Sequence, residues 1–535
     1  MVDTLGTAAA KSPHSSIPDA LRSQPSWSDQ MVRNAGLAVV DVAFVTVGGG
    51  LGSFVMVDLL RIAGVPASQI KILTGLEYPW QNYEYLTAVS QIPLAGRLRS
   101  DSGSCPDNVW AFPSYALREA FSARHVSGFI GPLWNVLTDG VLCDYWTPKK
   151  GQMFAALQRE ADRIDYWSSL SQGQVTVVRK RTGGGYFTLL DPAGSSSPVA
   201  YRSRFVHLAV GYPGLRFLED LQRYRRSYGD HHRVVHAYEP HEHVYEELNR
   251  RGGTVVVRGA GIAASQVLDR LICDRRRHGA ATTIVHIFRT YIDGARGPSM
   301  FKRRRGGKGW AYQGFNCPKS TWGGQGRAQL DKLEGEARAQ MLRDIAGTTT
   351  ARRKGWNAQL EAGRREGFYR AYEANVDEVV PGPPGTVLLR LRPPPAAHPT
   401  VPTEPIVPTE PTVPTEPIVL AANFIIDTTG LVGDLSQHPV LADLLEHRTA
   451  ARNPLGRLDV ERSFELRGAR SGPGRMYAAG AATYGSYLAG VDTFLGLQIS
   501  ALEATDDLAA AGFCERIGIA RSMSQWWKWI KGRQP

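Results

Sequence analysis

The sequence predicts an α/β fold with two Rossmann-like dinucleotide-binding lobes and a substrate segment inserted in the second lobe. In the first lobe, the β-rich run 42–47 enters a glycine cluster, and apolar residues then continue at helical spacing over 54–60. The same order of strand, glycine turn and helix recurs over 254–272. A buried strand that passes through a glycine turn into a helix is typical of nucleotide-binding α/β units. We therefore expect two such units.

Length and composition agree with a large globular protein. The chain has 535 residues, of which 43% are hydrophobic and 21% charged, so more than one core is expected and disorder throughout is excluded. The net charge of +12 favours anionic partners such as nucleotide phosphates or an acidic substrate. The sharpest basic run, 302–305, lies beside glycines rather than on an amphipathic helix, so we expect no nucleic-acid partner; a solvated loop is the alternative reading of this run.

Cysteine usage and hydropathy predict a cytoplasmic protein without a membrane segment. The five cysteines are scattered and form no Cys-x-x-Cys pair, which indicates a reducing compartment. The most apolar stretch, 36–65, contains charged residues and glycines that would make a membrane crossing costly. The N-terminal region lacks the features of a signal peptide, and we expect residues 1–38 to be a flexible tail.

The predicted domain organisation places one lobe inside the other. Buried strands at 205–210 and 423–429, each followed by a glycine turn, are expected to close the two lobes. The expected divisions are the first part of one dinucleotide-binding domain over 39–225, a second dinucleotide-binding domain over 226–435 with a substrate segment at 297–345, and the C-terminal part of the first domain over 436–535.

A proline-rich loop is expected over 393–419. A six-residue unit, Val-Pro-Thr-Glu-Pro-Ile, starts at Val401 and is repeated with little change from Val407 and Val413. Proline fixes φ and removes a backbone donor, so the repeat predicts an extended loop between strands. A tolerated surface insertion and a ligand for a proline-reading domain are the two interpretations of this loop.

The first glycine cluster fits the G-x-G-x-x-[G/A/S] pattern with Gly48, Gly50 and Ser53, and Gly52 lies within it. The first glycine permits the turn, the second lets a pyrophosphate approach the backbone, and the helix that follows offers free N–H groups. The next strand, 70–73, should end on an acid that holds a ribose, but Thr74 stands there. Either Glu77 takes that role through a longer turn, or the ribose is held otherwise.

The second cluster has the same spacing in Gly259, Gly261 and Ala264. The strand after its helix ends on Arg289 and Thr290 instead of an acid. An arginine at this place accommodates the 2′-phosphate of NADPH, whereas an acid would hold the 2′-hydroxyl of NADH. NADPH is therefore favoured, with a surface salt bridge as the alternative role of Arg289.

Two dinucleotide sites in a chain without Cys-x-x-Cys predict a flavin that is reduced by NADPH and passes electrons to molecular oxygen. The polar segment 99–110 could line the flavin ring, with Ser102 at its polar edge and Trp110 against its face, or it could be a surface loop. The histidines between 231 and 243 suit no familiar zinc pattern, so no metal site is expected.

From 42 to 508 the chain resembles the class B flavoprotein monooxygenases. The segment 209–212 (Ala-Val-Gly-Tyr) is similar to the ATG-type turn of that family. The strand 475–480, followed by Gly490-Val-Asp-Thr-Phe, is similar to its closing FAD strand and helix, although Ala481 stands where many relatives have Asp. The resemblance implies FAD contacts at Gly480 and Asp492. It also implies that 39–225 and 436–535 form the FAD-binding domain and that 226–435 is the NADPH-binding domain.

Within that class the chain resembles the N-hydroxylating branch more than the Baeyer–Villiger enzymes. The stretch 236–243 replaces the Baeyer–Villiger element F-x-G-x-x-x-H-x-x-x-W with a sequence that begins His-Ala-Tyr. N-hydroxylating relatives act on ornithine, lysine or aspartate, and an Asn-containing segment helps them to hold substrate and NADP. The resemblance thus implies roles at the active site for Asn316 and Lys319.

The resulting functional hypothesis is an FAD- and NADPH-dependent monooxygenase that hydroxylates an amine through a C4a-hydroperoxyflavin. Few acids but several cations occur between 297 and 327, which favours a substrate with carboxylates held by Arg303 and Arg305. L-aspartate, oxidised on to nitrosuccinate, is the specific substrate expected, although these cations could equally hold NADPH phosphates. The alternatives are Baeyer–Villiger, S-oxygenation or halogenation chemistry on the same flavin, or a non-catalytic nucleotide-binding scaffold. Molecular oxygen and the amine are the expected partners, and a homo-oligomer stays open.

Overall fold

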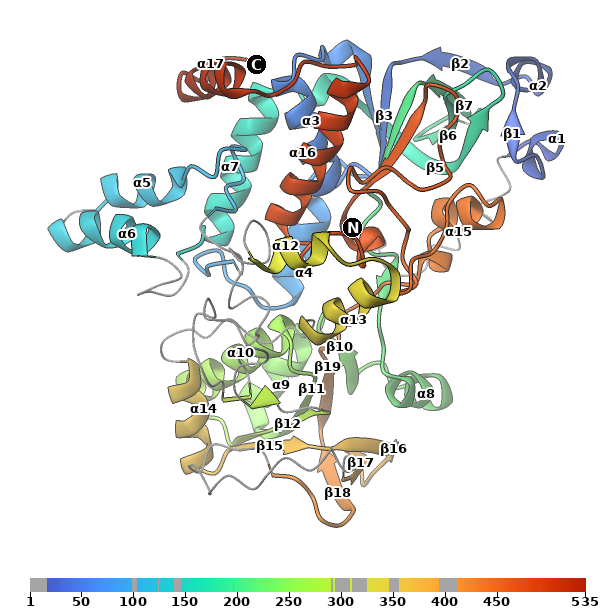
Figure 1. The fold of residues 1–535 in the computed structure, drawn as a ribbon. Coiled ribbons are helices and arrows are strands. Elements are labelled where there is room, and N and C mark those ends of the chain that lie inside the picture. The colour runs from blue at the N-terminus through green and yellow to red at the C-terminus, as the bar shows by residue number, and fades with distance from the viewer. Residues whose placement is uncertain are drawn as a thin grey trace.

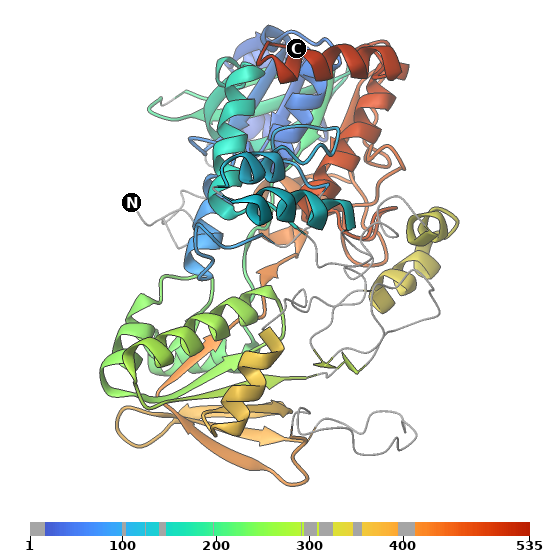
Figure 2. The same cartoon turned by 90° about the vertical axis from the view of Figure 1, so that its left-hand side faces the viewer.

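The computed structural model describes residues 17–98, 103–123, 125–138, 146–195, 197–289, 292–293, 308–309, 325–345, 356–393 and 412–535. The chain forms two α/β lobes, which lie one above the other in Figure 1. The upper lobe contains both the beginning and the end of the described chain, and the lower lobe is formed by the middle of it (Figure 2). The α/β fold with two Rossmann-like lobes is therefore confirmed.

The sheet of the upper lobe has a parallel core with an antiparallel extension. The parallel core runs in the order β5, β4, β3, β8 and β21, with bounds Leu170–Arg181, Ile70–Thr74, Phe44–Val47, Phe205–Leu208 and Arg475–Ala478. Strand β5 continues into the antiparallel strands β6 (Tyr186–Pro192) and β7 (Val199–Ser203), and β2 (Ala38–Asp41) pairs with β7. The closing strand β21 comes from the C-terminal part of the chain, as the resemblance implied.

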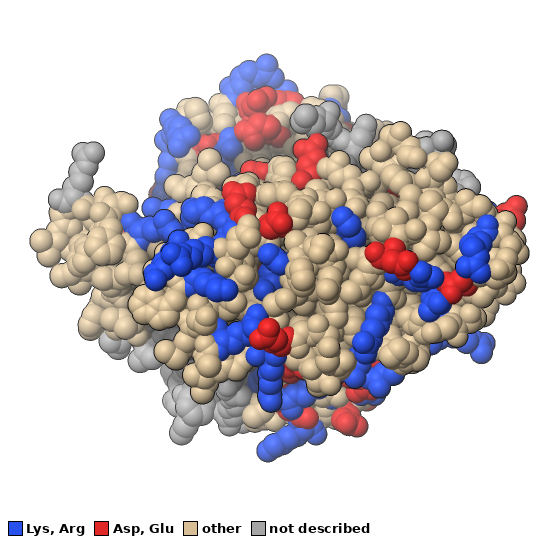
Figure 3. Space-filling view, turned by 90° about the horizontal axis from the view of Figure 1, so that it is seen from above, with Lys and Arg blue, Asp and Glu red and all other residues tan. Residues whose placement is uncertain are grey.

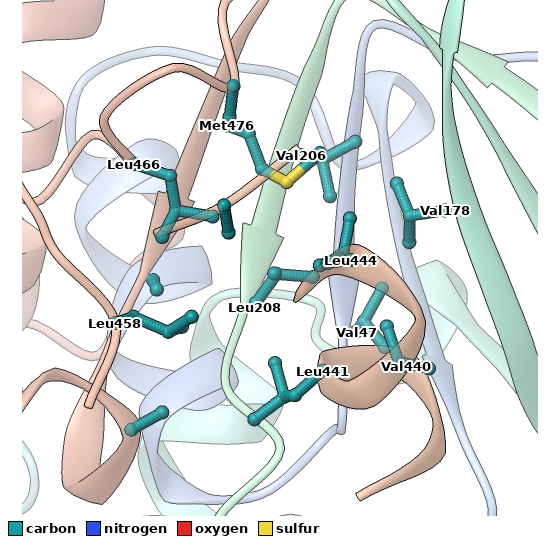
Figure 4. Close-up of a cluster of buried hydrophobic side chains, with 14 of the residues drawn as sticks. Val47, Val178, Val206, Leu208, Val440, Leu441, Leu444, Leu458, Leu466 and Met476 are labelled. Atoms are coloured by element: carbon teal, nitrogen blue, oxygen red, sulfur yellow. The ribbon is translucent and has the colours of Figure 1, made fainter. Parts of the chain in front are cut away.

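Helices cover both faces of this sheet. Three long helices pack over one face, namely α3 (Leu51–Ile62), α7 (Lys150–Arg163) and α16 (Phe494–Ala510). The other face carries α15 (Pro439–Glu446), whose Leu441 and Leu444 pack onto Val47 and Leu208 of neighbouring strands (Figure 4). Burial of these apolar side chains stabilises the packing of helices on the sheet by roughly 25 cal/mol per Å² of apolar surface. This packing holds in place the end of β3, which leads into the first glycine turn.

The expected flexible tail is wrong for residues 17–38. This segment forms α1 (Asp19–Arg22), strand β1 (Ser26–Trp27) and α2 (Asp29–Asn34). Strand β1 pairs with β5, and Trp27 is fully buried with its indole N–H donating to the Leu21 carbonyl at 3.0 Å. A few large apolar residues in an otherwise polar segment are enough to bind it to the sheet, which average composition does not reveal. Residues 1–16 lie outside the described chain.

The lower lobe contains a parallel sheet of five strands. Its order is β10, β19, β11, β12 and β15, with bounds Val234–His236, Phe424–Asp427, Gly253–Arg258, Thr282–Phe288 and Tyr369–Glu373. Helices α9 (Glu242–Arg251), α10 (Ile262–His278) and α14 (Trp356–Arg365) pack on one face. The other face is covered by α8 (Glu219–Tyr228) and by the antiparallel strands β16 (Asn375–Pro381), β17 (Val387–Arg392) and β18 (Ile418–Ala422).

Two stretches of chain join the lobes and pair with each other. Strand β9 (Gly214–Leu215), which leaves the upper lobe, pairs antiparallel with β20 (Leu431–Val432), which returns to it. Within the described residues, no helix has the length and apolar character needed to cross a membrane.

Part of the predicted substrate segment packs on the upper lobe, although its sequence is inserted in the lower one. The described part forms α12 (Gln325–Asp331) and α13 (Gly335–Ile345). Arg327 pairs with Glu503 of α16 at 2.5 Å, and the Arg338 guanidinium lies 3.5 Å from the centre of the Tyr487 ring. The described helices of this insertion therefore lie against the C-terminal part of the upper lobe.

The end of the proline-rich segment takes part in the lower lobe. Thr412 forms a parallel bridge with Tyr372 of β15, and Ile418 is the first residue of β18, where it pairs with Leu391. The expected loop 393–419 thus extends too far at its C-terminal end, because the backbones of Thr412 and Ile418 already pair with strands there. Residues 394–411 lie outside the described chain.

Two deletions in this segment should have different effects. Deleting 401–418 removes the Thr412 and Ile418 pairings, so we expect the melting temperature to fall by several degrees. Deleting only the first repeat, 401–406, should leave melting temperature and flavin content unchanged, because the free energy of loop closure changes slowly with loop length. Thermal unfolding of both variants checks this, and equal melting temperatures for the two deletions would contradict it.

Candidate active site between the lobes

A cavity of about 760 Å³ lies between the lobes and reaches both glycine turns. Its lining includes eight of the predicted residues: Gly48, Gly50, Gly52, Gly259, Gly261, Arg289, Gly480 and Asp492. The carboxyl ends of β3, β8 and β21 above and of β11, β12 and β19 below all lead into it. Ligands of open α/β sheets bind at such strand ends, and this cavity reaches both predicted dinucleotide sites.

The first glycine turn leaves no room for side chains on its inner side. Gly48 has φ of +119°, and a Cβ there would lie 2.3 Å from the Ala209 carbonyl oxygen. A Cβ on Gly49 would collide with Thr74, whose hydroxyl donates to the Gly48 carbonyl at 2.9 Å. Gly50, in contrast, has no neighbour closer than 4.0 Å. The turn therefore has the shape expected of a backbone that approaches a pyrophosphate closely.

A chain of buried polar groups supports this turn from below. Ser53 is fully buried in α3, and its Oγ accepts from the Gly49 N–H at 3.1 Å and from the Thr46 hydroxyl at 2.8 Å. The Nδ1 of His207 on β8 lies 3.0 Å from the same hydroxyl. Ser53 thus holds the glycine turn against the sheet and is not among the cavity-lining residues.

The second glycine turn has its own buried histidine. Gly259 has φ of +121°, and a Cβ there would lie 2.6 Å from the Thr428 hydroxyl. His286 of β12 donates from Nε2 to the Gly259 carbonyl at 2.6 Å, and its Nδ1 lies 3.1 Å from the Tyr369 hydroxyl. Ala264 is fully buried in α10, where its small side chain permits close packing of helix on sheet. A histidine on the neighbouring strand therefore fixes the turn in each lobe.

Both histidines are neutral in the folded protein, because burial lowers the pKa of His207 to about 3 and that of His286 to about 3. Their unfolded pKa is near 6.5, so they stabilise the fold fully above about pH 6.5, and this stability is lost as the pH falls from there towards 3. We expect each to reduce the free energy of unfolding by about 2 kcal/mol at about pH 5. Denaturant unfolding of the His207→Asn variant should show a weaker decline between neutral pH and pH 5 than the wild type. The exposed-site variant His278→Asn is the control, and an unchanged decline in His207→Asn would contradict the assignment.

Cations in the cavity are available to anionic ligands. Arg216, beside the β9–β20 ribbon, and Arg289, just after β12, are exposed and have no side-chain partner among the described residues. Arg258 differs, because it is paired with Asp220 of α8. In the upper part of the cavity, Asp492 accepts a hydrogen bond from the Tyr212 hydroxyl at 2.6 Å. Burial and this carboxylate raise the pKa of Tyr212, so its proton stays in place.

Helix α4 (Gln81–Val89) forms a wall of the cavity that the sequence did not predict. Its residues Asn82, Tyr83, Leu86 and Thr87 line the cavity, together with Tyr238 from the connection between β10 and α9. Burial raises the pKa of Tyr83. The tyrosine-rich stretch after β4 could have indicated this wall of the cavity, but its apolar residues do not recur clearly at helical spacing.

Two predicted cofactor residues lie elsewhere. Glu77 is exposed, its backbone N–H donates to the Gln81 side chain at 2.8 Å, and it is not among the cavity-lining residues. Trp110 donates from Nε1 to the Ser522 hydroxyl at 2.8 Å and packs against Trp529 of α17 (Ile519–Ile530). Its place is thus against the C-terminal helix, not along the cavity, because that helix offers both a polar partner and aromatic contacts.

The remaining predicted site residues lie outside the described chain: Ser102, Thr290, Arg303, Arg305, Asn316 and Lys319. Their assignments stay predictions from the sequence. Within the described residues, no group of three or more His, Cys, Asp or Glu could hold a metal ion. His236 and His241 instead contact backbone carbonyls, of Arg216 at 3.1 Å and of Glu239 at 2.7 Å.

The sequence matches no protein-family model and none of the curated proteins. Solved structures with the same fold include the cadaverine monooxygenase DfoA of Erwinia amylovora bound to FAD, with a TM-score of 0.59 and 13% identity over 88% of this chain and 95% of that one. The L-lysine 6-monooxygenase of Pseudomonas syringae has a TM-score of 0.57 at 14% identity, covering 88% and 99% of the two chains. The ornithine N-hydroxylase of Kutzneria sp. 744, with reduced FAD, NADP+ and L-ornithine, has a TM-score of 0.55 at 12% identity, covering 88% and 100%. The chain therefore has the fold of the class B flavin-dependent N-hydroxylating monooxygenases.

Proposed function

We propose that the protein is an FAD- and NADPH-dependent monooxygenase that hydroxylates the nitrogen of a small amine or amino acid. The observation that carries this proposal is the single cavity that reaches both glycine turns, because electron transfer from one dinucleotide to the other requires them to meet. The fold shared with three amine or amino-acid monooxygenases supports it.

The two cofactors are assigned to different lobes. FAD belongs to the upper lobe, where Gly48, Gly50, Gly480 and Asp492 line the cavity. NADPH belongs to the lower lobe, where Gly259 and Gly261 form the turn and Arg289, which has no side-chain partner among the described residues, would meet the 2′-phosphate. Arg216, on the connecting ribbon, supplies a second cation for the phosphates of NADPH.

The overall reaction takes an amine, O2, NADPH and a proton to the hydroxylamine, water and NADP+. When bound, the flavin would accept hydride from NADPH and activate O2. The described residues would orient the dinucleotides through the backbone of the two glycine turns and through Arg216 and Arg289. The amine must lose its proton to react as a nucleophile, so the site has to favour the neutral amine.

L-aspartate, oxidised on to nitrosuccinate, is our specific substrate hypothesis. It rests on Arg303, Arg305 and Lys319 of the sequence, which would hold carboxylates. The three proteins of the same fold act, by their names, on cadaverine, lysine and ornithine, so these amines are the necessary competitors in any assay.

The test is amine-dependent NADPH oxidation by the FAD-loaded protein, with product mass measured for L-aspartate, L-ornithine, L-lysine and cadaverine. A product heavier by oxygen from one of these amines supports N-hydroxylation, and only turnover of aspartate supports the specific hypothesis. A protein that binds no flavin would be the scaffold considered above. Oxygenation of a ketone or sulfide without amine turnover would point to the other flavin chemistries.

A further inference from the structure

The helix pair α5 (Ser114–Phe121) and α6 (Val126–Thr138) presents an apolar surface that nothing in the described chain covers. The described side chains of α6 include a single buried one, Pro132. Large apolar residues of α6 recur at positions 126, 130, 134 and 137, which places them along one side of the helix. Phe129 borders this stripe and meets Phe121 of α5 edge to face, with ring centres 5.6 Å apart. We call these six residues the α6 stripe: Phe121, Val126, Phe129, Ile130, Trp134 and Leu137.

The stripe is too large to be an ordinary exposed surface. The exposed fractions of its members run from 40% for Phe129 to 80% for Leu137. Weighted by these fractions, the six side chains present on the order of 600 Å² of apolar surface, if a large side chain measures about 150–250 Å². The largest contiguous apolar patch on a typical soluble monomer measures about 300–600 Å² and is often functional, so the stripe lies at the upper end of that range. A stable dimer buries about 800 Å² on each partner, so the stripe and its immediate rim suffice for one.

The composition of the stripe favours a second copy of this chain over a lipid surface. No charged residue occurs between Val126 and Thr138. Interfacial lipid-binding helices carry Lys and Arg on their polar side, whereas the cores of protein interfaces are poor in charge and rich in aromatic residues. The other side of α6, at Gly128, Gly131 and Pro132, borders a hollow whose lining carries charges of both signs, including Arg118 and Glu119.

The absence of charge also makes the stripe self-complementary. In a twofold dimer both copies use the same surface, so an apolar stripe meets an apolar stripe. The C-terminal helix α17 differs from α6 in charge. Its exposed Ile519, Met523 and Trp527 lie on a helix that also carries Arg521 and Lys528. The α5–α6 pair projects at the left of Figure 1, and the corresponding edge of Figure 3 is largely free of charged side chains.

We propose that two copies of this chain associate through their α6 stripes in a twofold dimer. The hairpin is tied to the cofactor lobe through the segment that precedes it. There the carbonyls of Cys105 and Asn108 each accept from the Gln498 side chain of α16 at 3.1 Å, next to the cavity-lining Leu497.

The test is the mass of the FAD-loaded protein in solution, measured by light scattering after size exclusion. We expect the wild type to have twice the mass of one 58.6 kDa chain. The variant Ile130→Glu/Trp134→Glu should have the mass of one chain with flavin content unchanged. The matched control Met523→Glu/Trp527→Glu on α17 should stay dimeric.

Charge complementation separates a true interface from a folding defect. A second variant, Ile130→Lys/Trp134→Lys, should also be monomeric alone, and an equal mixture of the two α6 variants should regain the dimer mass. A monomeric wild type, an α6 variant that stays dimeric, dissociation by the α17 variant, or a mixture that stays monomeric would each overturn the proposal. Stripe-dependent pelleting of a monomeric wild type with phosphatidylcholine–phosphatidylglycerol vesicles would overturn it in favour of a lipid surface.

Discussion

Replacing Arg289 by alanine is expected to raise the Michaelis constant for NADPH by about 10- to 150-fold while changing that for NADH little. The range corresponds to about 1.5–3 kcal/mol for a charge-assisted hydrogen bond, with 1.4 kcal/mol for each factor of ten. Arg289 lies just after β12, lines the cavity and has no side-chain partner among the described residues, so its charge is free for the 2′-phosphate. Initial rates of NADPH and NADH oxidation with a fixed amine give both constants.

Two further arginine variants make this result specific. Arg277→Ala, on the exposed end of α10, removes the same charge away from the cavity and should change neither constant. Arg216→Ala should weaken both cofactors alike, since Arg216 is assigned to phosphates that NADPH and NADH share. An equal loss for NADPH and NADH in Arg289→Ala would show that this residue does not read the 2′-phosphate.

Replacing Gly48 by alanine is expected to yield a protein without bound FAD. The new Cβ would lie 2.3 Å from the Ala209 carbonyl oxygen, and the φ of +119° is one that L side chains rarely adopt. The turn can relieve this contact only by moving the backbone that is proposed to meet the pyrophosphate. Flavin absorbance per mole of purified protein measures the loss, and a circular dichroism spectrum reports whether the fold is kept.

Two glycine controls distinguish this effect from general strain. Gly194 also has a positive φ, of +76°, but a Cβ at this position would meet no atom within 4 Å. The Gly194→Ala variant should therefore keep its FAD. Gly259→Ala places its Cβ 2.6 Å from the Thr428 hydroxyl in the lower lobe. We expect it to retain FAD that dithionite reduces but NADPH does not. Normal FAD content in Gly48→Ala, or loss of FAD from Gly259→Ala, would contradict the assignment of cofactors to lobes.

The features that could be predicted from the sequence are those that local chemistry determines. The glycine turns at Gly48 and Gly259 follow buried strands and adopt positive φ, so the pattern of residue types alone marks them. The place of Arg289 could be predicted in the same way, because the short apolar run before it marks where the strand ends. These positions converge on one cavity, as the two-site hypothesis requires.

The features that the sequence could not reveal depend on contacts between distant segments. Trp110 was expected beside a flavin, but its partner Ser522 lies 412 positions away, on a helix with no local signal for this contact. The same holds for Arg327, whose partner Glu503 places the inserted helices on the other lobe. The supporting role of His207 was also invisible, because only the folded sheet brings it beside Thr46 and the glycine turn.

The central claim is that the two turns hold FAD and NADPH together for the oxygenation of an amine. The most direct measurement is turnover under ¹⁸O2, with NADPH consumed and product formed followed in the same reaction. We expect a hydroxylamine that contains ¹⁸O and forms in proportion to the NADPH oxidised. NADPH oxidation that reduces the flavin but transfers no oxygen to any amine, or a protein that binds no flavin, would contradict it.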